Sequence, residues 1–462
     1  MNGQESSVDL SGRRRVHVVG AGGAGMSAIA LVLSRMGHEV TGSDLKSSRA
    51  LERLAAAGLD VRVGHDAALV EGAELVAIST AIGSANVELQ RARELGVPVL
   101  SRADLLAAIA GLRRSVAVAG THGKTTTTSM LALILVQAGM RPSFIVGGDV
   151  NDIGTNAAWD DGEWLVVEAD ESDGTFLRLH PEIALVTSLE PDHLEHYGSY
   201  DELRSSFARF VAGAGRALVY GDAPDSAALL GTAPAGSALY GRSPAARFKV
   251  SDVHTSRAEA TFSLSDAGEP LGRFSLPVPG EHNALNAAAA TGAALMMGAS
   301  AEDARLALAR FAGVARRYEF RGERRGVTFV DDYAHLPGEV AATLAAARRG
   351  GYSRVVAVFQ PHRYSRTQAL ASQFADAFVD ADVVVVTAVY AAGEAARPGV
   401  SGQLVVDAVR AAHPEADVSY VPDHESLLEV LRQTLRPGDL CISLEAGDLA
   451  GLPDELLSDE RW

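Results

Sequence analysis

At Val116-Ala-Val-Ala-Gly-Thr-His-Gly-Lys-Thr-Thr126, an apolar run of strand type breaks into a glycine-containing turn, and an apolar helical pattern follows at once. A strand, a loop and a helix in this order are typical of a phosphate-binding loop, because backbone N–H groups and the helix N-terminus then face phosphate oxygens. Lys124 is expected to reach the β- and γ-phosphates, and the Thr125 hydroxyl to bind Mg²⁺. The usual G-x-x-x-x-G-K spacing would place its first glycine at position 118, which is valine here. The first glycine of this loop is Gly120, so the loop is shorter than usual.

The composition of the chain is that of an ordinary globular protein. Its 462 residues exceed what one hydrophobic core accommodates, so about two to four domains are expected. The net charge is −17 and no basic run is visible, which argues against nucleic-acid binding. Apolar runs reach only strand length, and residues 1–10 contain no apolar signal core, so we expect no stable membrane insertion. Cys441 is the only cysteine, which excludes an intrachain disulfide and favours the cytoplasm.

Strand-like and helical segments alternate from Arg15 onward, which predicts an α/β fold with parallel, doubly wound sheets. The first domain, residues 13–112, should hold strands at 16–19, 38–42, 75–79 and 97–100 and a helix at 24–36. The second, residues 113–313, should add strands at 164–168 and 183–188, an antiparallel appendage at 248–254, 259–264 and 272–276, and a helix at 282–297. The third, residues 314–462, should form another parallel sheet from strands at 327–330, 355–359, 383–386 and 440–443.

The first domain carries its own glycine-rich turn, Gly20-Ala-Gly-Gly-Ala-Gly25, between a predicted strand and a predicted helix. The turn matches G-x-G-x-x-G, which lets a nucleotide pyrophosphate approach the backbone. Asp44 lies at the end of the next strand, where a ribose-binding acid belongs. NAD, FAD and UDP-sugars all carry a pyrophosphate, so the pattern predicts a diphosphate-containing nucleotide without choosing among them.

Several carboxylates follow predicted strands of the second domain, at the edge where ligands gather in open α/β sheets. Glu168 comes directly after one strand, and His193 follows the neighbouring strand. Because Mg²⁺ takes few protein ligands beside phosphate oxygens, we expect Thr125, Glu168 and His193 to form its site next to ATP. Glu171 and Asp173 can also be interpreted as solvated loop acids.

The alanine-rich helix opens with His282-Asn-Ala-Leu-Asn286, which places three polar side chains on one face. Amide side chains suit recognition of the edge of a base. Capping of the helix by an asparagine is an equally good interpretation of the same residues.

Taken together, these motifs resemble those of the Mur ligase family, and within it the branch that adds L-alanine. The resemblance runs from about Val16 to Asp448 and is carried by Val19-Gly-Ala-Gly-Gly-Ala-Gly-Met26, Gly120-Thr-His-Gly-Lys-Thr-Thr126, Glu168-Ala-Asp-Glu-Ser-Asp173, Asp192-His193, His282-Asn-Ala-Leu-Asn286, Arg316-Arg-Tyr318, Asp331-Asp-Tyr-Ala-His335 and Phe359-Gln-Pro-His-Arg-Tyr-Ser-Arg-Thr367. It implies a Rossmann-like UDP-sugar-binding domain, a central phosphate-loop ATPase domain, and a Rossmann-like C-terminal domain that closes over both and helps to bind the amino acid.

The resemblance also implies a role for each matching residue. ATP binding is implied for Gly120, Thr121, Gly123, Lys124, Thr125, Thr126, His282, Asn283, Asn286, Arg317 and Asp332. UDP-sugar binding is implied for Gly22, Gly23, Ala24, Gly25, Met26, Ser43 and Asp44. L-Alanine binding is implied for His335, His362, Arg363 and Arg366. Catalytic roles are implied for Lys124, His193, Arg363 and Arg366, and a magnesium site for Thr125, Glu168 and His193.

The reaction implied by the resemblance is an ATP-dependent ligation in peptidoglycan precursor synthesis. The γ-phosphate of ATP would pass to the lactyl carboxylate of UDP-N-acetylmuramate, and the amine of L-alanine would displace phosphate from the acyl phosphate. Positive charge from Lys124, Mg²⁺ and an arginine would neutralise the anions that meet there. We expect a monomer or a weak homodimer.

Three positions depart from the family pattern. Leu336 stands where a second histidine is usual, and Glu445 stands where a Gly-Ala-Gly-Asp motif usually begins. Phe207 lies near the position of a lysine that sister ligases carbamylate, which argues against those branches. The competing interpretations are a nicotinamide oxidoreductase, a catalytically idle UDP-sugar sensor, and a ligase that adds a preformed peptide.

Overall fold

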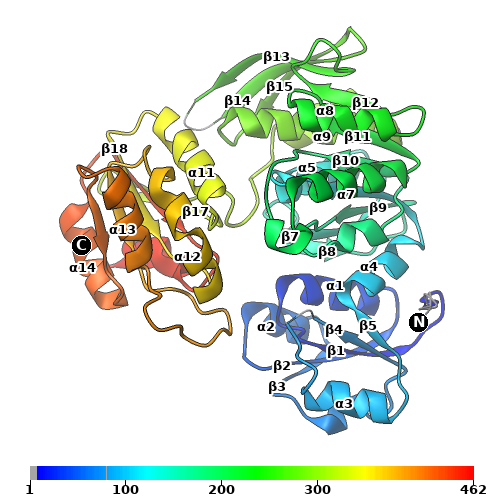
Figure 1. Cartoon of the computed structure of the whole chain (residues 1–462). Coiled ribbons are helices and arrows are strands. Elements are labelled where there is room, and N and C mark those ends of the chain that lie inside the picture. Colours follow the sequence, from blue (N-terminus) through cyan, green and yellow to red (C-terminus); the bar gives the residue numbers. More distant parts are fainter. Residues whose placement is uncertain (1–7, 80, 257–258, 462) are drawn as a thin grey trace. The chain divides into compact units, whose positions relative to one another are not determined.

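The computed structural model describes residues 8–79, 81–256 and 259–461. The chain divides into two compact units, of which the first holds two β-sheets and the second, beginning at Gly313, holds one (Figure 1). Three sheets with their own helices confirm the predicted three-domain α/β fold. The domain limits predicted from the sequence stay predictions. Within the described ranges, no helix is long and apolar enough to cross a bilayer.

The first sheet is wholly parallel, in the order β3-β2-β1-β4-β5. Its strands are β1 (Arg15–Val19), β2 (Glu39–Asp44), β3 (Asp60–Val63), β4 (Leu75–Ile78) and β5 (Val99–Ser101), and its helices are α1 (Ala24–Arg35), α2 (Arg49–Ala56), α3 (Val87–Glu94) and α4 (Arg102–Ala110). The central strand β1 is buried from Val16 to Val19, as parallel strands covered on both faces are. The glycine-rich turn follows the end of β1 and therefore lies at the carboxyl edge of the sheet.

The second sheet has the order β15-β14-β13-β12-β11-β10-β6-β9-β7-β8. Its strands are β6 (Arg114–Ala119), β7 (Ser143–Val150), β8 (Thr155–Ala158), β9 (Trp164–Glu168), β10 (Ile183–Val186), β11 (Arg216–Tyr220), β12 (Ala238–Gly241), β13 (Phe248–Thr255), β14 (Ala260–Asp266) and β15 (Glu269–Leu276). Its helices are α5 (Lys124–Gln137), α6 (Leu194–Tyr197), α7 (Tyr200–Ala212), α8 (Pro224–Ala228), α9 (Glu281–Met297) and α10 (Ala301–Leu308). The antiparallel pairing of β13, β14 and β15 confirms the predicted appendage.

The third sheet has the order β16-β17-β21-β18-β19-β20. Its strands are β16 (Glu319–Arg324), β17 (Val327–Asp332), β18 (Arg354–Phe359), β19 (Val383–Val386), β20 (Val418–Tyr420) and β21 (Asp439–Leu444), and its helices are α11 (Pro337–Arg349), α12 (Tyr364–Leu370), α13 (Gln403–Ala412), α14 (His424–Thr434) and α15 (Leu452–Ser458). The four strands that the sequence predicted, β17, β18, β19 and β21, are parallel, and the unpredicted edge strand β16 pairs with β17 antiparallel. Cys441 on β21 is buried, which raises the pKa of its thiol to about 12 and disfavours the reactive thiolate.

Candidate active site

The phosphate loop ends in helix α5, which begins at Lys124. Gly123 precedes the helix with a φ of 81°, in the left-handed region that favours glycine, and no side chain caps the helix there. A Cβ atom at Gly123 would lie 2.5 Å from Oδ1 of Asn286, so glycine is also what lets α9 approach the loop. The first N–H groups of α5 thus have no side-chain partner in their own helix and can bind phosphate oxygens.

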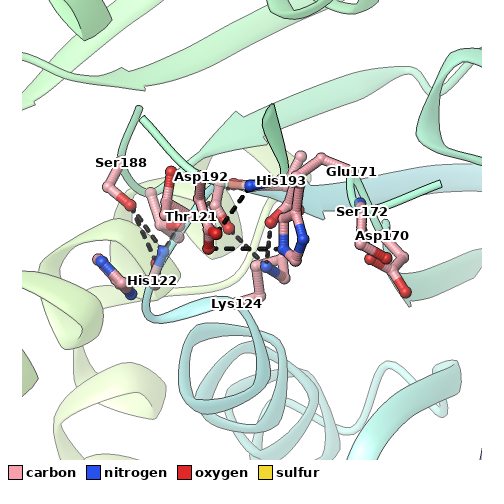
Figure 2. A network of polar contacts seen from close by, with 12 residues as sticks. Thr121, His122, Lys124, Asp170, Glu171, Ser172, Ser188, Asp192 and His193 are labelled. Carbon is pink, nitrogen blue, oxygen red and sulfur yellow. Dashed lines mark hydrogen bonds and ion pairs between the residues drawn. The ribbon is translucent and has the colours of Figure 1, made fainter. Parts of the chain in front are cut away.

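Lys124 is held at the loop by two acceptors. Its Nζ atom donates to the carbonyl oxygen of Gly120 at 2.7 Å and to Oε1 of Glu171 at 2.6 Å, and Figure 2 shows this group at the centre of the network. Burial lowers the pKa of Lys124, but the charges of Glu171 and Asp170 outweigh it, so the pKa lies above its ordinary value and the ammonium stays protonated. Glu171 is 2% exposed, so its interpretation as a solvated acid is wrong. The exposed Asp173 fits that interpretation.

A hydroxyl and a carboxylate meet beside the loop. Thr125 donates its Oγ1 proton to Oε1 of Glu168 at 3.0 Å, and the Gly147 N–H donates to Oε2 at 2.7 Å. Such a hydroxyl–carboxylate pair suits Mg²⁺, which keeps waters and phosphate oxygens as its other ligands. His193 lies on the loop after β10, with Nε2 3.5 Å from Oδ2 of Asp192. In the ranges that the structure describes, no group of three His, Cys, Asp or Glu side chains could hold a metal ion alone.

The loop is anchored to the segment after β10 by contacts that the sequence did not reveal. The Thr187 hydroxyl donates to the His122 carbonyl oxygen at 2.5 Å, and the His122 N–H donates to the Ser188 hydroxyl at 2.8 Å. The Glu190 N–H donates to the Thr121 hydroxyl at 3.0 Å. These bonds fix the curvature of the loop, while Thr126 follows inside α5. The only signal in the sequence for these contacts was that Thr187, Ser188 and Glu190 lie in or directly after a predicted strand.

The polar face at the start of α9 adjoins the phosphate loop. Asn283 and Asn286 are each 8% exposed, and His282 is exposed. Asn283 donates Nδ2 to the Pro279 carbonyl oxygen at 2.7 Å. Gly280 occupies the N-cap position and no side chain caps the helix, so the capping interpretation of the asparagines is wrong. The structure thus brings Asn286 to the loop, and recognition of a base by this face stays a prediction.

The glycine-rich turn of the first domain is held by Asp44. The Gly22 N–H donates to Oδ2 of Asp44 at 2.8 Å, and Gly23, Ala24 and Gly25 lead into α1, which has no side-chain cap. Ser43 and Met26 are buried, and the Ser43 hydroxyl donates to Oε2 of Glu88 at 2.6 Å. The structure places the seven predicted UDP-sugar residues around one turn, with Ser43 and Met26 facing inward.

The second unit gathers Arg317 and Asp332 at the carboxyl end of β17. Asp332 accepts the Tyr318 N–H at 2.7 Å and the Ala334 N–H at 2.8 Å, and burial raises its pKa. The Arg317 guanidinium lies 5.3 Å from the centre of the Tyr333 ring. The two residues therefore lie in one local cluster, and their role in ATP binding stays a prediction.

The four predicted amino-acid residues also meet in the second unit. The rings of His335 and His362 are 5.4 Å apart, and Arg366 donates Nη1 to Nδ1 of His362 at 3.2 Å. Burial lowers the pKa of His362 to about 3, helped by His335 and Arg366, so this imidazole is neutral and accepts a hydrogen bond. Arg363 has a φ of 67° and donates its N–H to the Tyr390 carbonyl oxygen at 2.8 Å. This strained backbone fixes the start of α12.

Two of the departures from the family pattern have local partners. The Leu336 N–H donates to Oε2 of Glu339 at 3.1 Å, so the backbone at this position is held without a histidine. Glu445 is fully buried and forms an ion pair with Arg316, whose Nε atom lies 3.7 Å from Oδ2 of Asp331. Two buried carboxylates therefore share one guanidinium.

These features define a class of three-domain α/β proteins whose central domain carries a nucleotide-phosphate loop. Three family models match in chain order: "Mur ligase family, catalytic domain" over residues 15–114, "Mur ligase middle domain" over 118–294, and "Mur ligase, glutamate ligase domain" over 316–444. The chain belongs to the Mur ligase family.

Individual relatives are similar over almost the whole chain. The UDP-N-acetylmuramate–L-alanine ligase of Rubrobacter xylanophilus is 48% identical, with 96% of this chain and 99% of that protein covered. The enzyme of the same name from an Anaeromyxobacter species is 46% identical, covering 96% and 97%. The crystal structure of the UDP-N-acetylmuramate–alanine ligase MurC from Thermotoga maritima is similar with a TM-score of 0.83 at 28% identity, covering 96% and 98%. A murein peptide ligase from Psychrobacter arcticus, at 23% identity and a TM-score of 0.72, shares the fold.

Proposed function

We propose that this protein joins L-alanine to UDP-N-acetylmuramate with ATP, giving UDP-N-acetylmuramoyl-L-alanine, ADP and phosphate for peptidoglycan synthesis. The observation that supports this most strongly is 48% identity, across 96% of the chain, to a ligase with that name. Lys124, whose side chain is 16% exposed, and the Thr125–Glu168 pair supply the phosphate chemistry that such a reaction needs. Neither a nicotinamide oxidoreductase nor an idle UDP-sugar sensor accounts for this loop.

The proposed reaction brings several anions together. The lactyl carboxylate attacks the γ-phosphorus of ATP, the bond to the β–γ bridging oxygen breaks, and an acyl phosphate forms. The amine of L-alanine then attacks the acyl carbon and phosphate leaves. Lys124 binds the phosphate oxygens and neutralises charge that grows in transfer, which is the main contribution a protein makes to such a step.

Mg²⁺ is part of the proposal, since it neutralises phosphate charge in reactions of this kind. Thr125 and Glu168 would hold it, with His193 nearby as a further candidate ligand.

In the amino-acid site, Arg363 and Arg366 would bind the L-alanine carboxylate, because a guanidinium can hold a carboxylate with two parallel hydrogen bonds. His335 and His362 would line the same site. A location in the cytoplasm and a monomeric or weakly dimeric state belong to the same proposal.

Glu168→Gln is expected to raise the Mg²⁺ concentration needed for half-maximal activity by about tenfold or more, because an amide oxygen lacks the charge that this cation prefers. The measurement is initial rate against free Mg²⁺ at saturating ATP. Glu163→Gln is the matched control, since the Glu163 side chain is 78% exposed on the same domain. An unchanged Mg²⁺ requirement in Glu168→Gln would remove this residue from the metal site.

Arg366→Met is expected to raise the KM for L-alanine by about tenfold to a hundredfold and to leave the KM for ATP within about twofold, because it removes a charge-assisted hydrogen bond to the carboxylate. Steady-state kinetics with each substrate varied in turn measure both constants. Arg397→Met is the control, because Arg397 is exposed in the same unit and donates to Gln368. Equal increases in both constants would contradict a role specific to the amino acid.

The choice of amine is the finer part of the proposal. The purified protein would be given Mg-ATP and UDP-N-acetylmuramate with either L-alanine or the murein tripeptide, and the UDP-sugar product would be identified by mass spectrometry. We expect the L-alanine adduct only. The tripeptide adduct alone would move the protein to a peptide-adding role.

A further inference from the structure

Arg102, the first residue of α4, lies between the two phosphate-binding loops of the first unit. A Cβ atom at Gly25 would lie 2.7 Å from Nη1 of Arg102, so the guanidinium packs directly on the first turn of α1. Its Nη2 atom donates to Oδ2 of Asp170 at 3.1 Å. Asp170 directly precedes Glu171, whose Oε1 atom accepts a hydrogen bond from Nζ of Lys124 at 2.6 Å. The guanidinium thus connects the glycine-rich turn with the edge of the ATP loop.

The position is electrostatically unfavourable for a cation. Arg102 is at the N-terminal end of α4 and against the N-terminal turn of α1, and helix N-termini carry partial positive charge. The first turn of α1 contains no acidic residue, and Asp104 in the first turn of α4 is already bound to Ser101 and Arg178. Asp170, with a side chain 37% exposed, is the anion that Arg102 contacts. A second anion at this point would therefore be strongly attracted.

We propose that Arg102 is a substrate-binding residue that holds an oxyanion of the sugar nucleotide, either its diphosphate or its lactyl carboxylate. The inference rests on the proposed function and adds a residue to its substrate site. The guanidinium is 24% exposed and one of its edges is bound to Asp170. When the substrate binds, the Arg102 guanidinium donates hydrogen bonds to the substrate oxyanion and gives up some or all of its bonding to Asp170. Asp170 then competes with the substrate for the guanidinium.

The alternative is that the Arg102–Asp170 pair only ties two domains together. The two roles differ in what Asp170→Asn does. If the pair is only structural, then Arg102→Met and Asp170→Asn weaken substrate binding to the same extent. If Arg102 binds the substrate, then Arg102→Met weakens binding, whereas Asp170→Asn leaves it unchanged or makes it tighter because a competitor has gone.

The test is isothermal titration calorimetry of the whole chain without ATP, using UDP-N-acetylmuramate and UDP-N-acetylglucosamine as the two ligands. UDP-N-acetylglucosamine carries the diphosphate but lacks the lactyl carboxylate. The variants are Arg102→Met, Asp170→Asn and the control Arg178→Met, whose guanidinium pairs with Asp104 and is 53% exposed. Circular dichroism and the thermal unfolding midpoint of each variant show whether the chain remains folded.

We expect Arg102→Met to weaken binding of UDP-N-acetylmuramate by about tenfold to a hundredfold, as loss of a charge-assisted hydrogen bond does, and Arg178→Met to have no effect. An equal loss for UDP-N-acetylglucosamine identifies the diphosphate as the group bound, and a loss confined to UDP-N-acetylmuramate identifies the carboxylate. Wild-type affinity in Arg102→Met, or an equal loss in Asp170→Asn, overturns the inference while the proposed function stands. Absence of binding by the wild-type protein overturns both.

Discussion

Lys124→Met is expected to lower kcat for phosphate release by about 10²–10³-fold, because it removes the cation placed to neutralise charge on the transferred phosphoryl group. The same change leaves Glu171, which is 2% exposed, without its ion-pair partner at 2.6 Å. An uncompensated buried carboxylate costs about 3–5 kcal/mol of stability. Activity and stability should therefore fall together, and kcat and chemical denaturation measure the two effects.

A double variant separates these effects. Lys124→Met combined with Glu171→Gln removes both charges, so it should recover most of the lost stability and none of the lost kcat. Glu163→Gln on the same domain serves as a control for an exposed acid. Recovery of activity in the double variant would contradict a catalytic role for Lys124, since only the folding defect would then explain the single variant.

Arg316→Met should destabilise the protein by about 3–5 kcal/mol at pH 8 and by much less near pH 5, because it leaves two buried carboxylates without a cation. Burial raises the pKa of Asp331 to about 6 and that of Glu445 to about 7, against the pull of Arg316. Both groups thus bind protons more readily in the folded protein than in the unfolded chain. The stability that these two groups contribute is fully present below their pKa values in the unfolded chain. It is lost as the pH rises through their higher pKa values in the folded protein.

Removing Arg316 raises both folded pKa values further, so the extra loss of stability grows with pH. Urea denaturation of the wild type and the variant at about pH 5 and about pH 8 measures it. Arg348→Met is the control, since its pair with Asp382 is about one-third exposed and should contribute at most about 1 kcal/mol. A loss that is equal at both pH values would contradict the account of two buried acids sharing one guanidinium.

The strands and the turns that follow them could be predicted because local signals carry them. A glycine turn between an apolar run and a helical repeat predicted Lys124 at the start of α5, and a second apolar run predicted Glu168 at the end of β9. The topology of the sheet then brings Thr125 and Glu168 together. The strand β7 was missed because Ser143–Val150 contains two adjacent glycines and an aspartate, which weaken a strand pattern. The edge strand β16 was missed because Glu319–Arg324 is mostly charged.

The rest of the candidate site depends on contacts between distant segments. Nothing in the order of residues showed that Glu171 would face Lys124 while Asp173 stayed exposed. The sequence likewise did not show that Arg102 would pack on Gly25, or that Glu445 would share Arg316 with Asp331. Each depends on tertiary packing, which a local pattern does not encode.

The central claim is tested most directly by phosphate release from Mg-ATP in four mixtures: with UDP-N-acetylmuramate and L-alanine, with each alone, and with neither. The account predicts rapid release only when both are present, because the amine must consume an acyl phosphate that forms only on the UDP-sugar. Release that is independent of L-alanine or of UDP-N-acetylmuramate would contradict it. Absence of release in every mixture, from a protein that still binds both nucleotides, would contradict it equally and identify an idle binding protein.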